Sequence, residues 1–497
     1  MGSTLSRFLD VKKLSKTWSI GTYDMKHRLP CTLVVATTLC LALGFESQAE
    51  VDGQFGVENA MPKHLSQQDI ERLSINDLVA HGRALFLAKF TAAEGAGRPG
   101  ATGAIVPTAA EPTGASMFMR TAGADSNACR GCHNDPIAGG AGEFVANAFV
   151  SEGFSDADFD TVDPQFSNER GTPALNGSGL VELLAREMTR DLRAIRRIAA
   201  AKARKTGDTV RVALLAKGVS FGHLSLHADG FMDVSELEGV DQDLLIRPFS
   251  QKGVFTSLRQ FSVNALNAHH GIEAVERFGA QHTDTPDFDQ DGVNDEMSAG
   301  DVTALVAFQA LLPAPVSIMS DKANHAAVEQ GRKLFEGVGC ATCHVPELAL
   351  DSSVFSEPGP YNPAGNLRLN DVAAPLSFDI DVSFLARDDQ GRVLVPVFSD
   401  FKRHVIADAE RPHFANELLA QRFVNRDEFL TPRLWGVGST APYGHRGDLT
   451  TLSEAISHHG GEATASRRAF EALDDMDRRR IIGFLQTLRI PATEVGL

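Results

Sequence analysis

The sequence predicts a mainly α-helical chain in which one helical plan occurs twice, with long irregular insertions and a small β excursion in the first half. Three observations predict this fold. The pentad Cys-x-x-Cys-His occurs twice, at 129–133 and 340–344. A Gly-x-x-Leu-Phe pattern precedes each pentad, at 82–86 and 331–335. A Thr-Pro motif and then a His-His-Gly motif follow each pentad in the same order, which indicates an internal repeat.

The N-terminal segment 1–49 has the pattern of an export signal. A positive stretch begins at Met25, an apolar run covers 32–45, and Ser47-Gln48-Ala49 fits the small-x-small cleavage pattern. The apolar run is short for a bilayer span. We therefore predict a periplasmic or otherwise exported protein without a stable membrane span. Met25 is a possible true start, and an uncleaved anchor is the alternative interpretation.

Each pentad has the spacing that attaches a haem covalently. Two thiols three positions apart can each form a thioether with one vinyl group of the same haem, and the following His donates a ring nitrogen to the iron. The predicted attachment residues are Cys129, Cys132, Cys340 and Cys343, and the predicted proximal ligands are His133 and His344. Two covalently bound haem c groups are thus the predicted cofactors. Zinc and disulfide formation are the alternatives.

The repeated landmarks predict two cytochrome c-like haem domains from an internal duplication, at 50–318 and 319–497. Each has an opening helix, a pentad, a loop-rich middle and a closing helix that packs on the opening one. The closing helices share the pattern Asp-x-x-x-apolar-apolar-x-Phe, at 301–308 and 477–484. Chance recurrence of short motifs is the alternative.

The insertions distinguish the two halves. The Gly/Ala/Pro-rich stretch 93–123 predicts a surface loop. The segment from Thr209 to Asp233 alternates apolar and polar residues around an Asp-Gly turn, which predicts the β excursion. In the second half, 345–427 is rich in Pro, Asn and Asp and is predicted to be mainly irregular.

The His-His-Gly motifs, which end at Gly271 and Gly460, are candidates for the sixth iron ligands. Both follow the Thr-Pro motif, both end an amphipathic helix, and both occupy equivalent repeat positions. A single histidine in such a place would more often be structural. A repeated pair in a chain with two pentads favours ligation.

The second half resembles the C-terminal half of the bacterial di-haem cytochrome c peroxidase and MauG superfamily. The residues that carry the resemblance are Thr431-Pro432-x-Leu434, Ala441-Pro442-Tyr443-Gly444-His445-x-Gly447 and Leu452-x-x-Ala455. Over 75–490 the chain is similar to the di-haem oxidoreductases described as "putative peroxidases" or "thiol oxidoreductases". The motifs at 339–348, 434–438 and 459–463 carry this closer similarity.

The resemblance implies specific distal ligands. In the peroxidases the Met that ligates the electron-accepting haem lies fourteen positions after the His of the Pro-Tyr-x-His motif. Here that position is His459, followed by Gly460. The resemblance thus implies His459 as the distal ligand of the second haem, and the repeat makes His270 its counterpart at the first. Because Met raises the haem potential relative to His, this departure from the family predicts a second haem of lower potential.

Two further residues are candidates for the chemistry near a haem, and the catalytic residues are otherwise unknown. His445 would lie near the second haem without binding it, with a structural hydrogen bond as the alternative role. Trp435 is the only Trp outside the N-terminal segment. It could relay electrons, and simple packing in the haem pocket is the alternative.

Aspartates alternate along one segment of the first half with a Gly at its sixth position, a spacing that wraps a loop around Ca²⁺. The twelfth position is Ser298 instead of the bidentate Glu of an EF-hand. A looser Ca²⁺ loop is predicted, with a solvated acidic turn as the alternative. Its candidate ligands are Asp287, Asp289, Asp291 and Asp295.

Charge and motifs together favour an exported di-haem oxidoreductase of the peroxidase type. The net charge of −17 makes nucleic acid and anionic membrane surfaces unsuitable partners. An acidic surface suits a small redox partner protein, and the alternative is that it simply keeps an exported protein soluble. One haem would relay electrons to the other, where peroxide or another small molecule reacts. The alternatives are a non-catalytic bis-His electron-transfer cytochrome and, by analogy alone, a di-haem oxygenase.

Overall fold

A computed structural model describes residues 56–97, 128–143, 145–149, 167–318, 324–417 and 423–492. The predicted export signal, most of the predicted 93–123 loop and the predicted domain boundary lie outside the described residues. Within them, no helix is long and apolar enough to cross a membrane.

Helices dominate the described residues and are mostly short, apart from one of 29 residues. They are α2 (Gln67–Ile70), α3 (Ile75–Leu87), α4 (Cys129–Cys132), α5 (Ser178–Thr206), α6 (Leu258–Ala265), α7 (Val275–Phe278), α8 (Ala280–Thr283), α9 (Ala299–Ala310), α10 (His325–Gly337), α11 (Leu452–Ser457), α12 (Thr464–Glu471) and α13 (Asp475–Thr487). Single turns are the 3₁₀ segments η1 (Ala92–Glu94), η5 (Cys340–Thr342), η6 (Leu369–Asp371), η7 (His413–Ala415) and η8 (Gly461–Ala463), and the π-helical η3 (Leu266–His270).

The strands form small antiparallel sheets. The pairs are β1 (Val145–Phe149) with β2 (Ser167–Gly171), β6 (Val316–Ser317) with β13 (Leu488–Arg489), β7 (Leu348–Leu350) with β10 (Val393–Val395), β8 (Val354–Glu357) with β9 (Leu376–Asp379), and β11 (Arg403–Val405) with β12 (Glu428–Leu430). The one three-stranded sheet of the described residues is β3 (Val210–Ala216), β4 (Val219–Leu226) and β5 (Met232–Asp233). This mainly helical chain with small sheets agrees with the predicted fold class.

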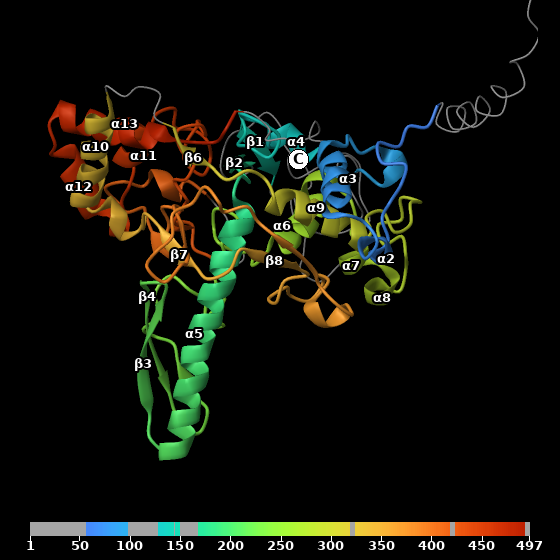
Figure 1. Cartoon of the computed structure of the whole chain (residues 1–497), viewed down its shortest axis with the longest axis horizontal. Coiled ribbons are helices and arrows are strands. Elements are labelled where there is room, and N and C mark those ends of the chain that lie inside the picture. Colours follow the sequence, from blue (N-terminus) through green and yellow to red (C-terminus); the bar gives the residue numbers. More distant parts are fainter. Residues whose placement is uncertain are drawn as a thin grey trace, which may run out of the picture. The chain divides into compact units, whose positions relative to one another are not determined.

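In the first half, α3 packs against α9 beside the first pentad (Figure 1). The Ser74 hydroxyl accepts a hydrogen bond from the Asp77 backbone at 3.2 Å and caps the start of α3. Gly82 lets the two helices touch, because a Cβ there would lie 2.0 Å from the Ala304 carbonyl oxygen. One turn later Phe86 packs on Phe308, with ring centroids 5.2 Å apart.

In the second half, α10 packs against α13 with matching contacts (Figure 1). A Cβ at Gly331 would lie 2.0 Å from the Arg480 carbonyl oxygen. Phe335 packs on Phe484 with ring centroids 5.7 Å apart. The predicted contact of closing and opening helix is therefore present in both halves, while their common origin by duplication stays a prediction.

We expect Gly331→Ala to destabilise the protein by about 1–3 kcal/mol, because the added methyl group forces α10 away from α13. Gly337→Ala in the same helix is the matched control, since a Cβ there meets nothing within 4 Å. That change should be neutral or stabilising by up to about 1 kcal/mol, because Ala favours helix more than Gly. Denaturant unfolding of the haem-loaded proteins measures both. Equal effects from the two variants would contradict the close approach.

The insertion of the first half consists of α5 and the three-stranded sheet, which run alongside each other (Figure 1). The predicted β excursion is present as β3 to β5. The first turns of α5 are buried, including Leu180, Val181 and Leu184. This long helix was not predicted from the sequence. Its residues 178–189 are buried without interruption, so this part shows no one-sided pattern of buried residues.

Candidate haem sites

The first pentad forms the single helical turn α4. This turn places Cys129 and Cys132 on one side, and the His133 backbone N–H donates to the Cys129 carbonyl oxygen at 3.0 Å. The His133 ring lies against Phe86, with centroids 6.2 Å apart. Burial lowers the pKa of His133 to about 4, so its imidazole is uncharged and keeps a lone pair for a metal.

The second pentad has the same relation to its opening helix. The His344 backbone N–H donates to the Cys340 carbonyl oxygen at 3.0 Å, and its ring lies 6.4 Å from that of Phe335. Burial lowers the pKa of His344 to about 4. Its Nδ1 lies 3.1 Å from the Phe398 carbonyl oxygen. Because a carbonyl oxygen can only accept a hydrogen bond, Nδ1 carries the proton, and Nε2 keeps its lone pair for iron.

In the described part of the chain, no disulfide joins the four pentad cysteines to one another. Burial raises the pKa of Cys129 to about 12 and that of Cys340 to about 11. Among the described residues, the one three-ligand cluster that includes a pentad cysteine joins Cys343 to Asp400 and His404.

His404 cannot act as a metal ligand in that cluster. Its Nε2 lies 2.8 Å from Asp400 Oδ2 and its Nδ1 lies 2.7 Å from Glu462 Oε2. Burial alone would lower its pKa, but the hydrogen bonds to Asp400, Cys343 and Glu462 outweigh burial and raise the pKa to about 11. Both ring nitrogens therefore carry protons. From the sequence, His404 is expected to be a surface or structural histidine, because its neighbours along the chain form no metal-ligand spacing.

The second His-His-Gly motif directs its two histidines to different environments. The Nδ1 of His459 lies 2.7 Å from the Ala455 carbonyl oxygen, so its Nε2 is free to bind a metal. Burial lowers the pKa of His459, and His459 in turn contributes to the lowered pKa of His344. These two imidazoles therefore lie within electrostatic range of each other. His458 instead stacks on His413, with ring centroids 4.1 Å apart.

The first His-His-Gly motif is arranged differently. His270 is buried, and its Nε2 lies 3.6 Å from Cys129 Sγ. His269 is the member of this pair that contributes to the lowered pKa of His133. Burial lowers the pKa of His269 itself to about 4, and its Nδ1 has no hydrogen-bond partner among the described residues. The ligand prediction for His270 stays untested, and His269 is a competing candidate.

The π-helical turn η3 explains why the two motifs differ. The first motif lies at the end of η3, whereas α11 is α-helical up to the second motif. A π turn adds one residue to a helix and rotates the following side chains. The equivalence predicted from sequence position is therefore not an equivalence of side-chain direction.

His445 lies in a buried charged cluster at the junction of the two halves. Its Nε2 is 3.1 Å from Glu417 Oε1, and Arg170 of the first half lies 2.9 Å from the same oxygen. The Phe414 ring packs against His445 at 6.0 Å and against His459 at 5.6 Å. His445 thus lies one aromatic ring away from His459, the candidate distal ligand.

Trp435 comes from the second half but packs in the hydrophobic core that contains most of the first half. A Cβ at Gly177 would lie 3.0 Å from Trp435 Cζ3. The indole Nε1 is buried and has no hydrogen-bond partner among the described residues. This position is compatible with both predicted roles, electron relay and packing.

The predicted Ca²⁺ loop is only partly assembled. Oxygens of Asp287, Asp289 and Asp291 lie within 4.8 Å of one another, but Asp295 is in no such group. Oxygens of Asp289 and of two buried glutamates, Glu273 and Glu296, form a second group, in which they also lie within 4.8 Å of one another. Neither glutamate was predicted as a ligand: Glu296 directly follows Asp295 outside the alternating pattern, and Glu273 lies before the segment.

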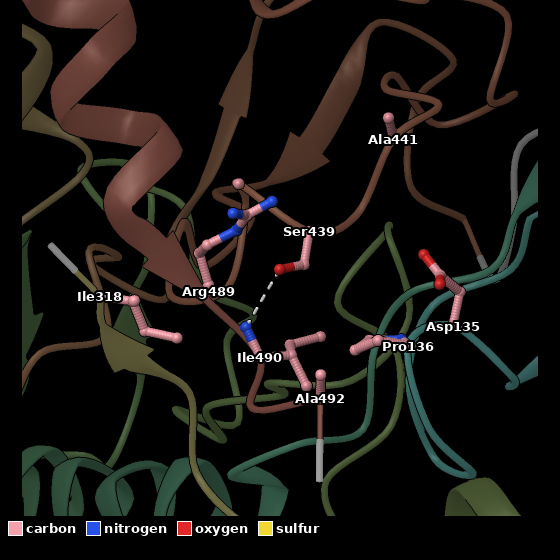
Figure 2. A pocket seen from close by; sticks show the side chains of 9 residues that line it. Asp135, Pro136, Ile318, Ser439, Ala441, Arg489, Ile490 and Ala492 are labelled. Atoms are coloured by element: carbon pink, nitrogen blue, oxygen red, sulfur yellow. Dashed lines mark hydrogen bonds between the residues drawn. The ribbon is translucent and has the colours of Figure 1, made fainter. Parts of the chain in front are cut away.

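A cavity of ≈ 470 Å³ lies close to the first pentad (Figure 2). It is lined from both halves, with Asp135 two residues after His133 and Arg489 near the end of α13. The Ile490 backbone N–H donates to Ser439 Oγ at 3.3 Å along its wall (Figure 2). The lining residues are Asp135, Pro136, Ile318, Gly438, Ser439, Ala441, Arg489, Ile490 and Ala492.

Comparison with known proteins gives one family. Residues 407–488 match the family described as "Di-haem oxidoreductase, putative peroxidase". This segment contains His445, His458 and His459, and it supports a haem redox function. No curated protein matches the chain.

Two solved structures show weak likeness. Hydrazine synthase of Kuenenia stuttgartiensis is 12% identical over 93% of this chain and 100% of its own, with a TM-score of 0.37. A MauG-like protein associated with microbial copper homeostasis is 15% identical over 62% of this chain and 88% of its own, with a TM-score of 0.25. At these TM-scores neither structure determines the fold of this chain.

Proposed function

Because residues 407–488 match the di-haem oxidoreductase family, we propose that the chain is an exported c-type cytochrome with two covalent haems and peroxidase-like activity. Its two haem domains, 50–318 and 319–497, derive from a duplication. One haem relays electrons to the other, where peroxide or another small molecule is turned over. A small redox protein exchanges the electrons.

The observation that carries this proposal is the pair of half-buried, uncharged imidazoles at the ends of the two pentads. His133 and His344 each follow one helical turn that carries two cysteines, and each packs on the Phe of its opening helix. Thioether attachment needs this spacing, and iron needs the uncharged ring. The residues present therefore fit two haem c groups, which supply the electron-transfer chemistry when bound.

At the second site the protein fixes two imidazoles by the same device. A backbone carbonyl accepts from Nδ1 of His344 and another from Nδ1 of His459, so both rings have the tautomer with a free Nε2. We assign His344 as the proximal and His459 as the distal ligand of the second haem. With both imidazoles bound, the second haem would have no place for peroxide and would supply electron transfer, so we assign the relay to this site.

At the first site the distal ligand is less firmly held. His270 is the ligand predicted by the repeat, while His269 is the one in electrostatic range of His133. The Nδ1 of His269 lacks a partner that would fix its tautomer, in contrast to His459. Since His269 lacks this support, it would hold a haem less firmly than His459 would, and we assign substrate turnover to the first haem.

The His445–Glu417 pair can hold and move a proton near the second site. Burial alone would raise the pKa of Glu417, but His445, Arg170 and Lys252 outweigh burial and lower it. Glu417 therefore stays charged and stabilises a proton on His445 Nε2, 3.1 Å away, although burial lowers the pKa of His445 itself. Phe414 keeps this pair apart from His459.

The bis-His carrier remains the second candidate function, because the arrangement of His344 and His459 favours a closed second iron. A carrier has two closed irons, whereas an enzyme opens one. The oxygenase alternative requires an open site too, and no contact among the described residues favours it.

We expect low-temperature EPR of the oxidised protein to show one low-spin iron with two axial histidines and a second iron that becomes high-spin after one-electron reduction. Stopped-flow mixing of this half-reduced protein with hydrogen peroxide should oxidise it at a rate proportional to peroxide. If both irons stay low-spin and peroxide does not react, the protein is a carrier. If the half-reduced protein reacts with oxygen but not with peroxide, the result favours the oxygenase function.

A further inference from the structure

Three carboxylates converge in the first half behind the first His-His-Gly motif. Oxygens of Glu273, Asp289 and Glu296 lie within 4.8 Å of one another. Glu273 is 4% exposed and Glu296 is 5% exposed. No basic side chain of the described residues forms an ion pair with any of the three. Such a cluster of negative charges is unfavourable in a buried place unless something neutralises it.

Two oxygens point into this cluster without a partner. Glu273 Oε1 and Glu296 Oε1 are both buried and accept no hydrogen bond from the described residues. The other oxygen of Glu296 is occupied, since it accepts the Glu273 backbone N–H at 2.6 Å. Because native proteins rarely leave buried polar atoms unsatisfied, the two free oxygens indicate a ligand.

Protons or a cation could neutralise the cluster. Burial raises the pKa of Glu296 to about 10, that of Glu273 to about 8 and that of Asp289 to about 7. These shifts show how strongly the site disfavours bare carboxylates. If protons neutralised the cluster, the adjacent carboxyl groups would have few acceptors for their hydrogen bonds. One divalent cation would instead bind all three carboxylates together.

We propose that Glu273, Asp289 and Glu296 bind a divalent cation of the Ca²⁺ class, with Asp287 and Asp291 at the solvent side of the site. The donors are all oxygens, which suit Ca²⁺ and not zinc or copper. Asp287 and Asp291 extend the cluster through Asp289. This site replaces the alternating aspartates as the centre of the metal binding, because Glu273 comes from outside the loop, Glu296 is not one of its alternating aspartates, and Asp295 is not among the ligands.

The cation site is connected to the first haem site through the backbone. Glu273 lies three residues after His270, and the Gly97 backbone N–H donates to the His270 carbonyl oxygen at 3.1 Å. Glu296 fills the space beside Gly95, where a Cβ would lie 2.1 Å from its carboxyl carbon. A cation that holds Glu273 and Glu296 together thus holds the segment that carries His269 and His270. This consequence rests on the proposed function, whereas cation binding itself does not.

The test uses the haem-loaded full chain, freed of metal by a chelator and titrated with CaCl₂. Wild type should bind one Ca²⁺ per chain by calorimetry and gain thermal stability. Glu273→Gln and Glu296→Gln, which keep size and hydrogen-bonding capacity, should each weaken binding at least tenfold. Asp295→Asn is the matched control, and it should bind as wild type does. An unchanged second-haem spectrum verifies that each variant is folded.

The outcomes separate the two proposals. Wild-type binding that both glutamine variants retain, or a wild type that binds no Ca²⁺, overturns the cation site. Loss of binding in Asp295→Asn but not in the glutamine variants would place the ion in the loop instead. Ca²⁺ should also change the EPR spectrum of the first haem and leave the second unchanged. Binding without any change at the first haem overturns the coupling and keeps the site.

Discussion

A chain in which Cys340 and Cys343 are both replaced by alanine is expected to keep one covalent haem, and the matching Cys129→Ala/Cys132→Ala chain is expected to keep the other. Thioether bonds are the only covalent link that the pentads offer, so each double replacement removes one haem completely. Haem-stained denaturing gels and a pyridine haemochrome titration per chain measure the result. Wild type should contain two.

The control for this experiment is Cys31→Ala/Cys40→Ala, which changes the two cysteines inside the predicted export signal. It should leave the haem content unchanged. Loss of both haems from one pentad change, or haem that acid acetone extracts from wild type, would contradict covalent attachment at two independent sites. Zinc in the purified wild type at the expense of haem would support the alternative instead.

Replacement of His459 by glycine is expected to convert the second iron from low-spin to high-spin and to open it to cyanide. The reason is that His459 is the imidazole whose Nδ1 is bound to the Ala455 carbonyl oxygen and which lies in electrostatic range of His344. EPR and cyanide titration measure the change, and added imidazole should reverse it. His458→Gly is the matched control, because that ring stacks on His413 instead.

The first site offers an equivalent pair of variants. If His269 is the ligand, His269→Gly should make the first iron high-spin and His270→Gly should not. If His270 is the ligand, as the repeat predicts, His270→Gly should make the first iron high-spin and His269→Gly should not. A wild-type spectrum in both variants and in His459→Gly would contradict axial histidine at either motif. The comparison of neighbouring residues within one motif controls for general disturbance of the fold.

The pentads show how much a local pattern can determine. The spacing of two cysteines and a histidine within five residues is fixed by the backbone, so the sequence alone predicts the attachment residues and the two proximal histidines. The opening and closing helices were also evident, because Gly82, Phe86 and their counterparts Gly331 and Phe335 recur at the same helical spacing. Their contacts in the structure match.

The sequence by itself determined which residues lie at the right spacing along the chain to act together. The tertiary structure decided in which direction their side chains point and how deeply they are buried. One π-helical turn rotates the first His-His-Gly motif, so that sequence position does not decide between His269 and His270. Glu273 and Glu296 are ordinary glutamates until folding buries them against Asp289. A motif fixes spacing through local backbone geometry, whereas burial and side-chain direction arise from contacts between distant segments.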